Sequence, residues 1–505
     1  MKKLLSLLLI SVLVVGLLAA CNTKDQTSAT SQSTVSATSA EESGEKVYKA
    51  NVPDVDYGKA KFKILTTAYS DSPQVTEFGF GEELKDGVVN TAVEERNAKV
   101  NDLLNIEIVE ELIVDTERFA GGKLNERVST ALQTGQDDFY LVLPSLYNCG
   151  ALSAAGAIYD LKGFDVLNDL SDPWWDQKFI EDLSIDGKMF FITGDISIDT
   201  RNSLTVCFFN KNMFRDNDLD DPYQLVKDKK WTFDHLIQLS KTIRSDLNQD
   251  NKIDYQDMFG LGGQNDLAWA MFYGSGERIA SKGADGYPEL SMYNTRSAKV
   301  MDKMLELMTN DDYFVNANKY FGVSSTPSVL ISDAFVANRA LIYCEGLGAV
   351  ERLRNMAAGT DFGILPIPLY DEEQTEYQHM INPWSGNAIA IPAYLDATKS
   401  EMAATVLQVL GAESKNYITP AYYDRALKKQ TASDRESQEM LDIIFSSIGS
   451  DMGHIYNWGK LGNQILHMSV ENKLTGQFKS LYETYQGAAQ QALNETVEAF
   501  KNLEY

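Results

Sequence analysis

The sequence predicts an α/β fold that is divided into two or more lobes and ends in a helical region. Three observations predict this class: strand-like and helix-like segments alternate over residues 61–145, a second alternating series begins near residue 203, and helical periodicity dominates residues 431–505. Alternation of this kind is typical of mostly parallel sheets with helices on both faces. The roughly 450 residues of the body exceed the usual size of one hydrophobic core, so more than one lobe is expected.

The first series predicts a ligand site beyond the end of a strand. It reads strand, helix, strand, helix, strand over the segments KFKILTTA (61–68), 90–104, NIEIVEE (105–111), NERVSTALQTG (125–135) and FYLVLPS (139–145). The first helix is predicted because Val89, Val93, Val100 and Leu104 share one face. In such sheets ligands bind beyond the carboxyl ends of the strands. Tyr147, which follows the last strand, is therefore a candidate ligand-binding residue.

The second series continues the α/β pattern. The segments, in order, are a strand SLTVCFFN (203–210), a helix in 229–245 capped near Thr232, a strand, glycine turn and helix in ALIYCEGLGAVERLRNMAAG (340–359), and strands DFGILPIP (361–368) and NAIAIPA (387–393). Ser433 and Glu436 match a capping box that opens the C-terminal helices. The turn after residue 345 mimics a dinucleotide fingerprint, but Glu351 at the third glycine position would repel pyrophosphate. We expect this turn to leave Glu345 facing a cleft instead.

The chain opens with a segment typical of secretion signals. Lys2 and Lys3 precede an apolar run over 4–18, which is shorter than the about 20 residues that a spanning helix needs. The following LAAC resembles the lipobox of bacterial lipoproteins, in which a diacylglycerol is attached to the cysteine and the signal is cut. We therefore expect a signal peptide over 1–20, a lipid anchor at Cys21 that holds the protein at the outer face of the cell membrane, and a disordered Ser/Thr-rich tether over 21–56.

Charge and cysteine usage limit the possible partners. The chain has 45 basic and 72 acidic residues and a net charge of −27, which argues against nucleic acid and anionic lipid as partners. The remaining cysteines, Cys149, Cys207 and Cys344, are odd in number and widely spaced. One disulfide is possible outside the cell, but the sequence does not choose a pair.

The segment DLNQDNKIDYQD (246–257) has the spacing of a calcium-binding loop of the EF-hand type. The expected ligands are the side chains of Asp246, Asn248, Asp250, Asp254 and Asp257 and the carbonyl oxygen of Lys252. Asn251 replaces the usual glycine at the sixth position, and asparagine tolerates the left-handed conformation better than most residues. The alternative is a plain solvated loop. We predict that the loop binds Ca²⁺ as a structural brace, since a single loop without a partner forms no cooperative switch.

The sequence carries no recognisable catalytic motif. It lacks the Gly-x-Ser-x-Gly, His-Glu-x-x-His and phosphate-binding loop patterns, and His235, His379, His454 and His467 are scattered. Carboxylates are so abundant that any glycosidase pair would be an arbitrary choice. We therefore predict a binding protein, not an enzyme, with no catalytic residues.

Aromatic residues at turns and segment ends are candidates for stacking on sugar rings. They are Trp175, Trp269, Tyr273, Trp384 and Trp458, and each stands near glycine, proline or polar residues. Packing in the core is the alternative for every one of them. Trp269 and Trp384 are favoured as ligand contacts because their surroundings are rich in glycine and serine.

The order of several segments resembles that of bacterial extracellular solute-binding proteins of the sugar type, family 1, which serve ABC importers. The likeness is carried by VVNTAVEERNAKVNDLLNIEI, DPWWDQKFIEDLSIDGKMFFITGDISI, FFNKNMF, DPYQLVKDKKWTFD, DFGILPIPLYDEEQTEYQ, NPWSGNAIAIP, TPAYYDRALKK and DMGHIYNWG, from about residue 60 to the C-terminus. Many members also carry an acidic loop after the WTFD helix, usually with glycine where this chain has Asn251.

The resemblance implies a two-lobed, periplasmic-binding-protein-like fold of type II. The N-lobe is expected over 57–198 with part of 388–430, the second lobe over 199–387, and C-terminal helices over 431–505 that pack across both. The lobes would be joined by crossings near 194–201 and 382–387. Asp195, Trp384 and Ser385 are candidate ligand contacts because they lie at these crossings.

The function that the resemblance implies is capture of a carbohydrate between the lobes and its delivery to the permease subunits of an ABC importer. The protein is expected to act as a monomer and to leave its ligand unchanged. Two alternatives remain open from the sequence: a surface-anchored glycoside hydrolase, and a calcium-dependent adhesin or scaffold.

Overall fold

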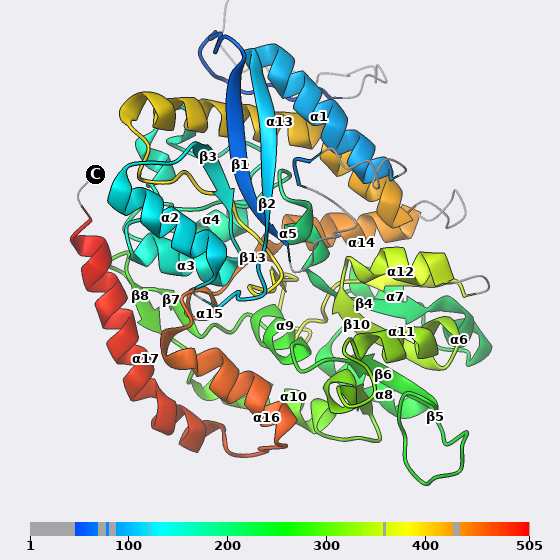
Figure 1. The fold of residues 1–505 in the computed structure, drawn as a ribbon. Helices are drawn as coiled ribbons and strands as arrows, with labels where there is room; N and C mark the ends of the chain where they lie inside the picture. Colours follow the sequence, from blue (N-terminus) through cyan, green and yellow to red (C-terminus); the bar gives the residue numbers. More distant parts are fainter. Residues whose placement is uncertain are drawn as a thin grey trace, which may run out of the picture. The chain divides into compact units, whose positions relative to one another are not determined.

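The computed structural model describes residues 46–68, 77–79, 87–119, 121–356, 360–427 and 435–503 (Figure 1). The expected signal peptide, the anchor at Cys21, most of the tether and Ser433 lie outside these residues. Residues Val47–Tyr505 form one compact unit. Its first residues have no regular secondary structure, but the amide of Tyr48 donates to Oδ1 of Asn416 at 2.8 Å. Among the described helices, none has the length and apolarity needed to cross a bilayer.

The first sheet is entirely parallel, as the alternation of strands and helices predicts. β1 (Ala60–Ala68) lies between β2 (Ile106–Val114) and β3 (Phe139–Leu143). The predicted helices are α1 (Val88–Leu104) and α2 (Lys123–Thr134). The segment NAIAIPA, predicted as a strand, runs antiparallel beside β3 and forms isolated bridges such as Val142 with Ala390.

The second sheet mixes parallel and antiparallel pairs. Its order is β11-β4-β10-β6-β5, with β9 beside β6. The strands are β4 (Thr205–Asn210), β5 (Arg244–Ser245), β6 (Met258–Gly263), β9 (Phe314–Asn316), β10 (Ala340–Gly346) and β11 (Phe362–Leu365). β6 is parallel to β9 and β10, whereas β4 is antiparallel to both of its neighbours. β4 therefore departs from the parallel order that the alternation of strands and helices predicts.

The remaining elements cover these sheets and link them. The helices are α3 (Leu146–Ala154), α4 (Gln177–Leu183), α5 (Ile198–Asn202), α6 (Lys211–Asp216), α7 (Pro222–Lys227), α8 (Phe233–Thr242), α9 (Leu267–Gly274), α10 (Thr295–Met308), α11 (Ser328–Val336), α12 (Ala349–Met356), α13 (Ala397–Leu427), α14 (Arg435–Ser446), α15 (Met452–Ile455), α16 (Met468–Glu471) and α17 (Phe478–Lys501). Two short pairs complete the set, β7 (Ala280–Lys282) with β8 (Pro288–Leu290), and β12 (His379–Met380) with β13 (Ile448–Gly449). The predicted cap of α8 is confirmed, since the Thr232 side chain accepts from the amide of His235.

Two crossing segments lie side by side between the sheets. The first contains α5, and the second covers residues 381–387. Leu204 bridges Ile381, Thr200 Oγ1 donates to the carbonyl of Asn387 at 2.7 Å, and the amide of Asn382 donates to the carbonyl of Ser203 at 3.3 Å. Helix α13 is a further link, because it packs against α1 and β3 on one side and against α12 and α14 on the other (Figure 1).

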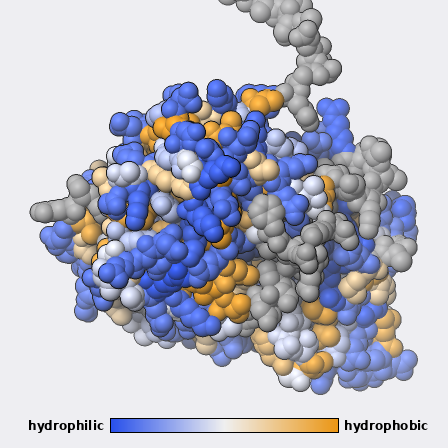
Figure 2. Space-filling model, turned by 45° about the horizontal axis from the view of Figure 1, so that its top comes forward, coloured by the Kyte–Doolittle hydropathy of each residue, from blue (hydrophilic) through white to orange (hydrophobic). Residues whose placement is uncertain are grey.

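The surface fits an acidic protein surrounded by water. In the view of Figure 2, hydrophilic residues cover most of the coloured surface and hydrophobic residues form small, scattered patches. Single exposed apolar residues are normal on soluble domains and carry no functional meaning by themselves.

Glycine is required at residue 194, at the start of the first crossing. A Cβ atom there would lie 2.1 Å from the carbonyl oxygen of Trp174. We expect Gly194→Ala to lower the free energy of unfolding by about 1–3 kcal/mol or more, because backbone atoms must move to admit the methyl group. Gly487→Ala is the control: this exposed glycine inside α17 has no atom within 4 Å of an added Cβ, so the change should stabilise by roughly 0.5–1 kcal/mol. Chemical denaturation measures the free energy of unfolding of both variants. Equal changes in the two variants would contradict the close contact at residue 194.

Candidate functional site

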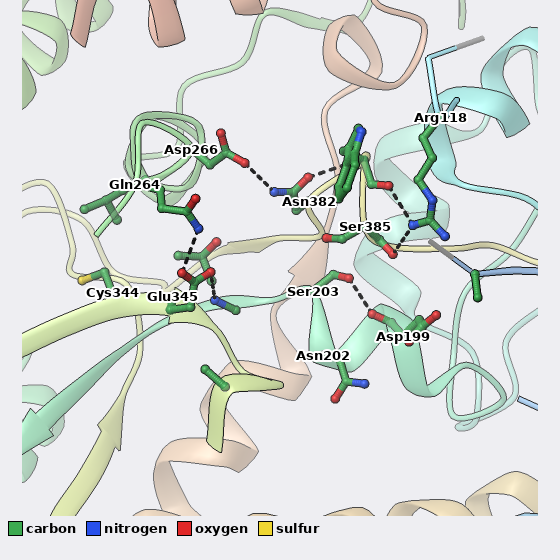
Figure 3. A pocket seen from close by; sticks show the side chains of 16 residues that line it. Arg118, Asp199, Asn202, Ser203, Gln264, Asp266, Cys344, Glu345, Asn382 and Ser385 are labelled. Carbon is green, nitrogen blue, oxygen red and sulfur yellow. Dashed lines mark hydrogen bonds between the residues drawn. The ribbon is translucent and has the colours of Figure 1, made fainter. Parts of the chain in front are cut away.

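A cavity of about 520 Å³ opens where the two sheets and the two crossing segments meet (Figure 3). Its walls come from the ends of β1, β6 and β10, from the start of β4, and from both crossings. The lining residues are Ala68, Arg118, Asp199, Asn202, Ser203, Thr205, Gln264, Asp266, Leu267, Cys344, Glu345, Gly346, Ala349, Asn382, Trp384 and Ser385. The volume is within the roughly 300–1,000 Å³ range of small-molecule sites, and the carboxyl ends of parallel strands are where α/β sheets bind ligands.

Glu345 lies near the end of β10 and is held by neutral donors. Its Oε2 accepts from Nε2 of Gln264 at 2.8 Å and from the hydroxyl of Tyr343 at 3.1 Å, and its Oε1 accepts from the amide of Gly346 at 3.0 Å. Burial raises the pKa of Glu345, and these hydrogen bonds partly oppose the shift. The side chain is thus fixed in one orientation at the cavity wall.

Asp266 stands at the N-terminus of α9 and faces the same cavity. Its Oδ2 accepts from Nδ2 of Asn382 at 3.0 Å, which joins the second lobe to the second crossing. Its Oδ1 lies 3.8 Å from Nε2 of His467. Partial burial raises the pKa of Asp266, His467 and Asn382 partly oppose the shift, and the side chain remains 37% exposed. That exposure leaves the carboxylate within reach of a ligand.

Arg118 and Trp384 form the wall that comes from the first lobe and the second crossing. Nη1 of Arg118 donates to the carbonyl oxygens of Trp384 and Ser385 at 3.0 and 3.2 Å, and its guanidinium lies 5.7 Å from the centre of the Trp384 ring. Burial lowers the pKa of Arg118, and the charges of Asp199 and Asp115 partly oppose the shift. The Trp384 amide donates to Oδ1 of Asn382 at 3.0 Å, which fixes the turn carrying the half-buried indole.

The structure brings three of the predicted contacts together in this cavity: Glu345, Trp384 and Ser385. Tyr147 and Trp269 lie in an adjacent aromatic cluster around His454, with ring centres 5.9 and 4.4 Å from the imidazole. Neither lines the cavity, because both rings are buried in packing between elements.

The other predicted contacts are packed elsewhere. Trp175 donates to Oε1 of Gln408 on α13, Tyr273 donates to Asp182, and Trp458 donates to Thr496 on α17. Asp195 pairs with Arg201 and lies 3.0 Å from Nζ of Lys415, in a separate pocket of about 300 Å³. For these residues core packing or ion pairing explains the position.

Several lining residues were not singled out from the sequence. Gln264 and Asp266 directly follow β6, so the rule that ligands bind at carboxyl ends of strands could have selected them. Asn382 stands in the same segment as Trp384. No local sequence pattern could have selected Arg118, because its position in the cavity depends on its contact with the second crossing, far along the chain.

The loop 246–257 is closed by backbone amides that donate to its acidic side chains. Asp246 accepts from the amides of Gln249 and Asn251 at 2.6 and 2.8 Å, and buried Asp257 accepts from those of Leu247 and Asp254. Asn251 adopts φ 65°, the conformation expected when it replaces glycine. Among the described residues, no group of three or more His, Cys, Asp or Glu side chains is arranged as a metal site. Calcium binding therefore stays a prediction.

Comparison with known proteins identifies the fold. No family model matches the chain. The curated proteins also contain no match. Among solved structures, a sugar transporter from Rhizobium etli in an open conformation has a TM-score of 0.53 at 14% identity and covers 88% of this chain and 100% of that chain. UgpB from Mycobacterium tuberculosis with glycerophosphocholine has a TM-score of 0.52 at 14% identity, covering 88% and 99%.

A third structure leads to the same class. The maltose/maltodextrin-binding domain MalE from Bdellovibrio bacteriovorus, bound to maltotriose, has a TM-score of 0.50 at 15% identity and covers 88% of this chain and 100% of that chain. The chain therefore has the two-lobed, periplasmic-binding-protein-like fold of ABC solute-binding proteins, and the predicted fold class is confirmed. The names of these similar proteins describe binding and transport.

Proposed function

We propose that the protein captures a carbohydrate in the cavity between its lobes and delivers it, unchanged, to an ABC importer. The observation that carries this proposal is the cavity itself, which joins an indole ring to carboxylate and amide side chains at the crossings. An aromatic face suits the apolar side of a sugar ring, and the polar groups suit its hydroxyls. The similar structures support the same class of ligand: MalE from Bdellovibrio bacteriovorus is bound to maltotriose, and an ABC substrate-binding protein from Listeria monocytogenes is in complex with cycloalternan.

Ligand binding would favour closure of the lobes about the paired crossings. Arg118 and the Trp384 turn approach the cavity from one side, while Gln264 and Glu345 approach it from the other. A ligand that contacts both sides binds the closed form more tightly and so shifts the population toward it. We further propose that the importer recognises this closed form and that Cys21 and the tether keep the protein beside the membrane.

Binding is tested by thermal melting with a panel of glycans. A ligand at 100 times its dissociation constant should add about 2.7 kcal/mol to the free energy of unfolding. Trp384→Ala should weaken binding by roughly tenfold, about 1.4 kcal/mol, through loss of the stacking surface. Tyr293→Ala is the control, since this partly exposed ring stacks on Tyr482 outside the cavity lining. Cleavage of a glycan on prolonged incubation would instead indicate a hydrolase, and binding unaffected by Trp384→Ala would exclude this cavity.

We also propose that the loop 246–257 binds Ca²⁺ as a brace. Millimolar Ca²⁺ should raise the melting temperature of protein freed of metal, and a chelator should reverse the rise, because an ion that binds only the native state stabilises it. Asp250→Asn should reduce the rise while keeping the oxygen that accepts from the Lys252 amide. If neither Ca²⁺ nor chelator changes the melting temperature, the loop does not act as a calcium brace. If chelation abolishes glycan binding, the loop does not act independently of the cavity.

A further inference from the structure

The described part of the cavity lining contains more acidic than basic side chains. Among the described residues, its carboxylates are Asp199, Asp266 and Glu345, and its cationic side chain is Arg118. Arg118 directs Nη1 to the carbonyl oxygens of Trp384 and Ser385 (Figure 3), and its charge is attracted to Asp199 and Asp115. No ion pair between Arg118 and Glu345 or Asp266 is found among the described residues.

Two of the carboxylates face the cavity without a strong counter-charge. In the described part of the chain, neither Glu345 nor Asp266 forms an ion pair with a lysine or arginine. Glu345 receives only amide and hydroxyl donors, and Asp266 receives Asn382 with His467 at 3.8 Å. Burial raises the pKa of both groups. Carboxylates that are partly shielded from water are stabilised by an opposite charge, and a bound ligand can supply one.

We propose that the preferred ligand is a carbohydrate that carries a positive charge, as an amino sugar does. This inference rests on the proposed capture of a carbohydrate and specifies its class. The ammonium group has three donors and is attracted to the carboxylates of Glu345 and Asp266, while the sugar ring stacks on Trp384. Neutral hydroxyls at the same position gain hydrogen bonds but no ionic attraction, so they bind more weakly.

The test compares sugars that differ in one substituent. Glucosamine, N-acetylglucosamine and glucose, their β-1,4-linked dimers, and the corresponding galactose monosaccharides are titrated calorimetrically into the full chain at low and high salt. In each set of matched sugars that binds, the amino sugar should bind at least tenfold more tightly than the sugars that carry an acetamide or a hydroxyl group instead. This difference in affinity should become smaller at high salt.

Two variants locate the preference. Glu345→Gln and Asp266→Asn should each remove most of the tenfold preference for the amine, because the affinity for the amine should fall further than the affinity for its hydroxyl counterpart. Trp384→Ala, in contrast, should weaken all members of a series alike. Neutral sugars binding as tightly as the amines would overturn this inference and leave carbohydrate capture standing. If no carbohydrate binds, both proposals fail.

A separate observation concerns two cysteines on adjacent strands. Cys207 on β4 lies directly opposite Cys344 on β10 in the antiparallel register, and their Sγ atoms are 3.0 Å apart. Directly opposed residues of antiparallel strands have Cα separations that a disulfide can span. Cys149 is remote from this pair, since its Sγ contacts the carbonyl oxygens of Pro144 and Ala388.

The geometry points to a Cys207–Cys344 disulfide when the chain folds in an oxidising compartment. Each thiol loses its proton and the pair transfers two electrons to a disulfide oxidant, such as oxidised glutathione, which is reduced to two thiols. The bond would form before the strands bury both sulfur atoms. Cys344 lines the cavity, so the bond would tie one cavity wall to the neighbouring strand.

Refolding the full chain with oxidised and reduced glutathione tests the bond. Peptide mapping should recover Cys207 and Cys344 in one linked species lighter by two hydrogen atoms, with Cys149 free. Cys207→Ser and Cys344→Ser should abolish this species, whereas Cys149→Ser should keep it. The oxidised chain should also melt at a higher temperature than the reduced chain. Recovery of both thiols unlinked, or a bond to Cys149, would overturn the assignment.

Discussion

The hydrogen bonds between the two crossing segments are the constraint on which the rest of the site depends. Thr200 and Asn387, and Ser203 and Asn382, hold α5 beside the turn that carries Trp384. The carboxylate of Glu77 further fixes α5 by accepting from the amides of Ile198 and Asp199 at 2.9 and 2.8 Å. Because the cavity is lined on both sides of this junction, bending of the crossings would change its shape.

The same junction explains how binding could be converted into a change between open and closed forms. Asp266 reaches from α9 to Asn382, and Arg118 reaches from the first lobe to the Trp384 and Ser385 carbonyls. Both contacts are made to the same short turn. A residue of each lobe is therefore hydrogen-bonded to that turn. A ligand placed against Trp384 would therefore be touched by both lobes without any rearrangement of the turn itself.

The positions of the tryptophans show that sequence neighbours alone do not distinguish a ligand-binding ring from a ring packed in the core. Trp175, Trp269 and Trp458 share turns and polar neighbours with Trp384, yet all three are buried, and only Trp384 stands at the cavity. A large ring near glycine packs closely in the core as readily as it stacks on a ligand. The distinction depends on Gln408 and Thr496, which lie far from Trp175 and Trp458 in sequence and accept their indole protons.

The sequence by itself determined the α/β class, the succession of helices and strands, and the cap at Thr232, because periodicity and capping depend on neighbours a few residues away. It also indicated Glu345 through the glycine turn that follows it and Trp384 through its Gly/Ser-rich setting, while the resemblance to solute-binding proteins indicated Trp384 and Ser385 through the expected crossings. Only the tertiary structure decided the antiparallel place of β4, the opposition of Cys207 and Cys344, and the convergence of Arg118 and Asp266 on one turn. These features join residues more than a hundred positions apart, and contacts of that range are set by how the sheets and crossings pack.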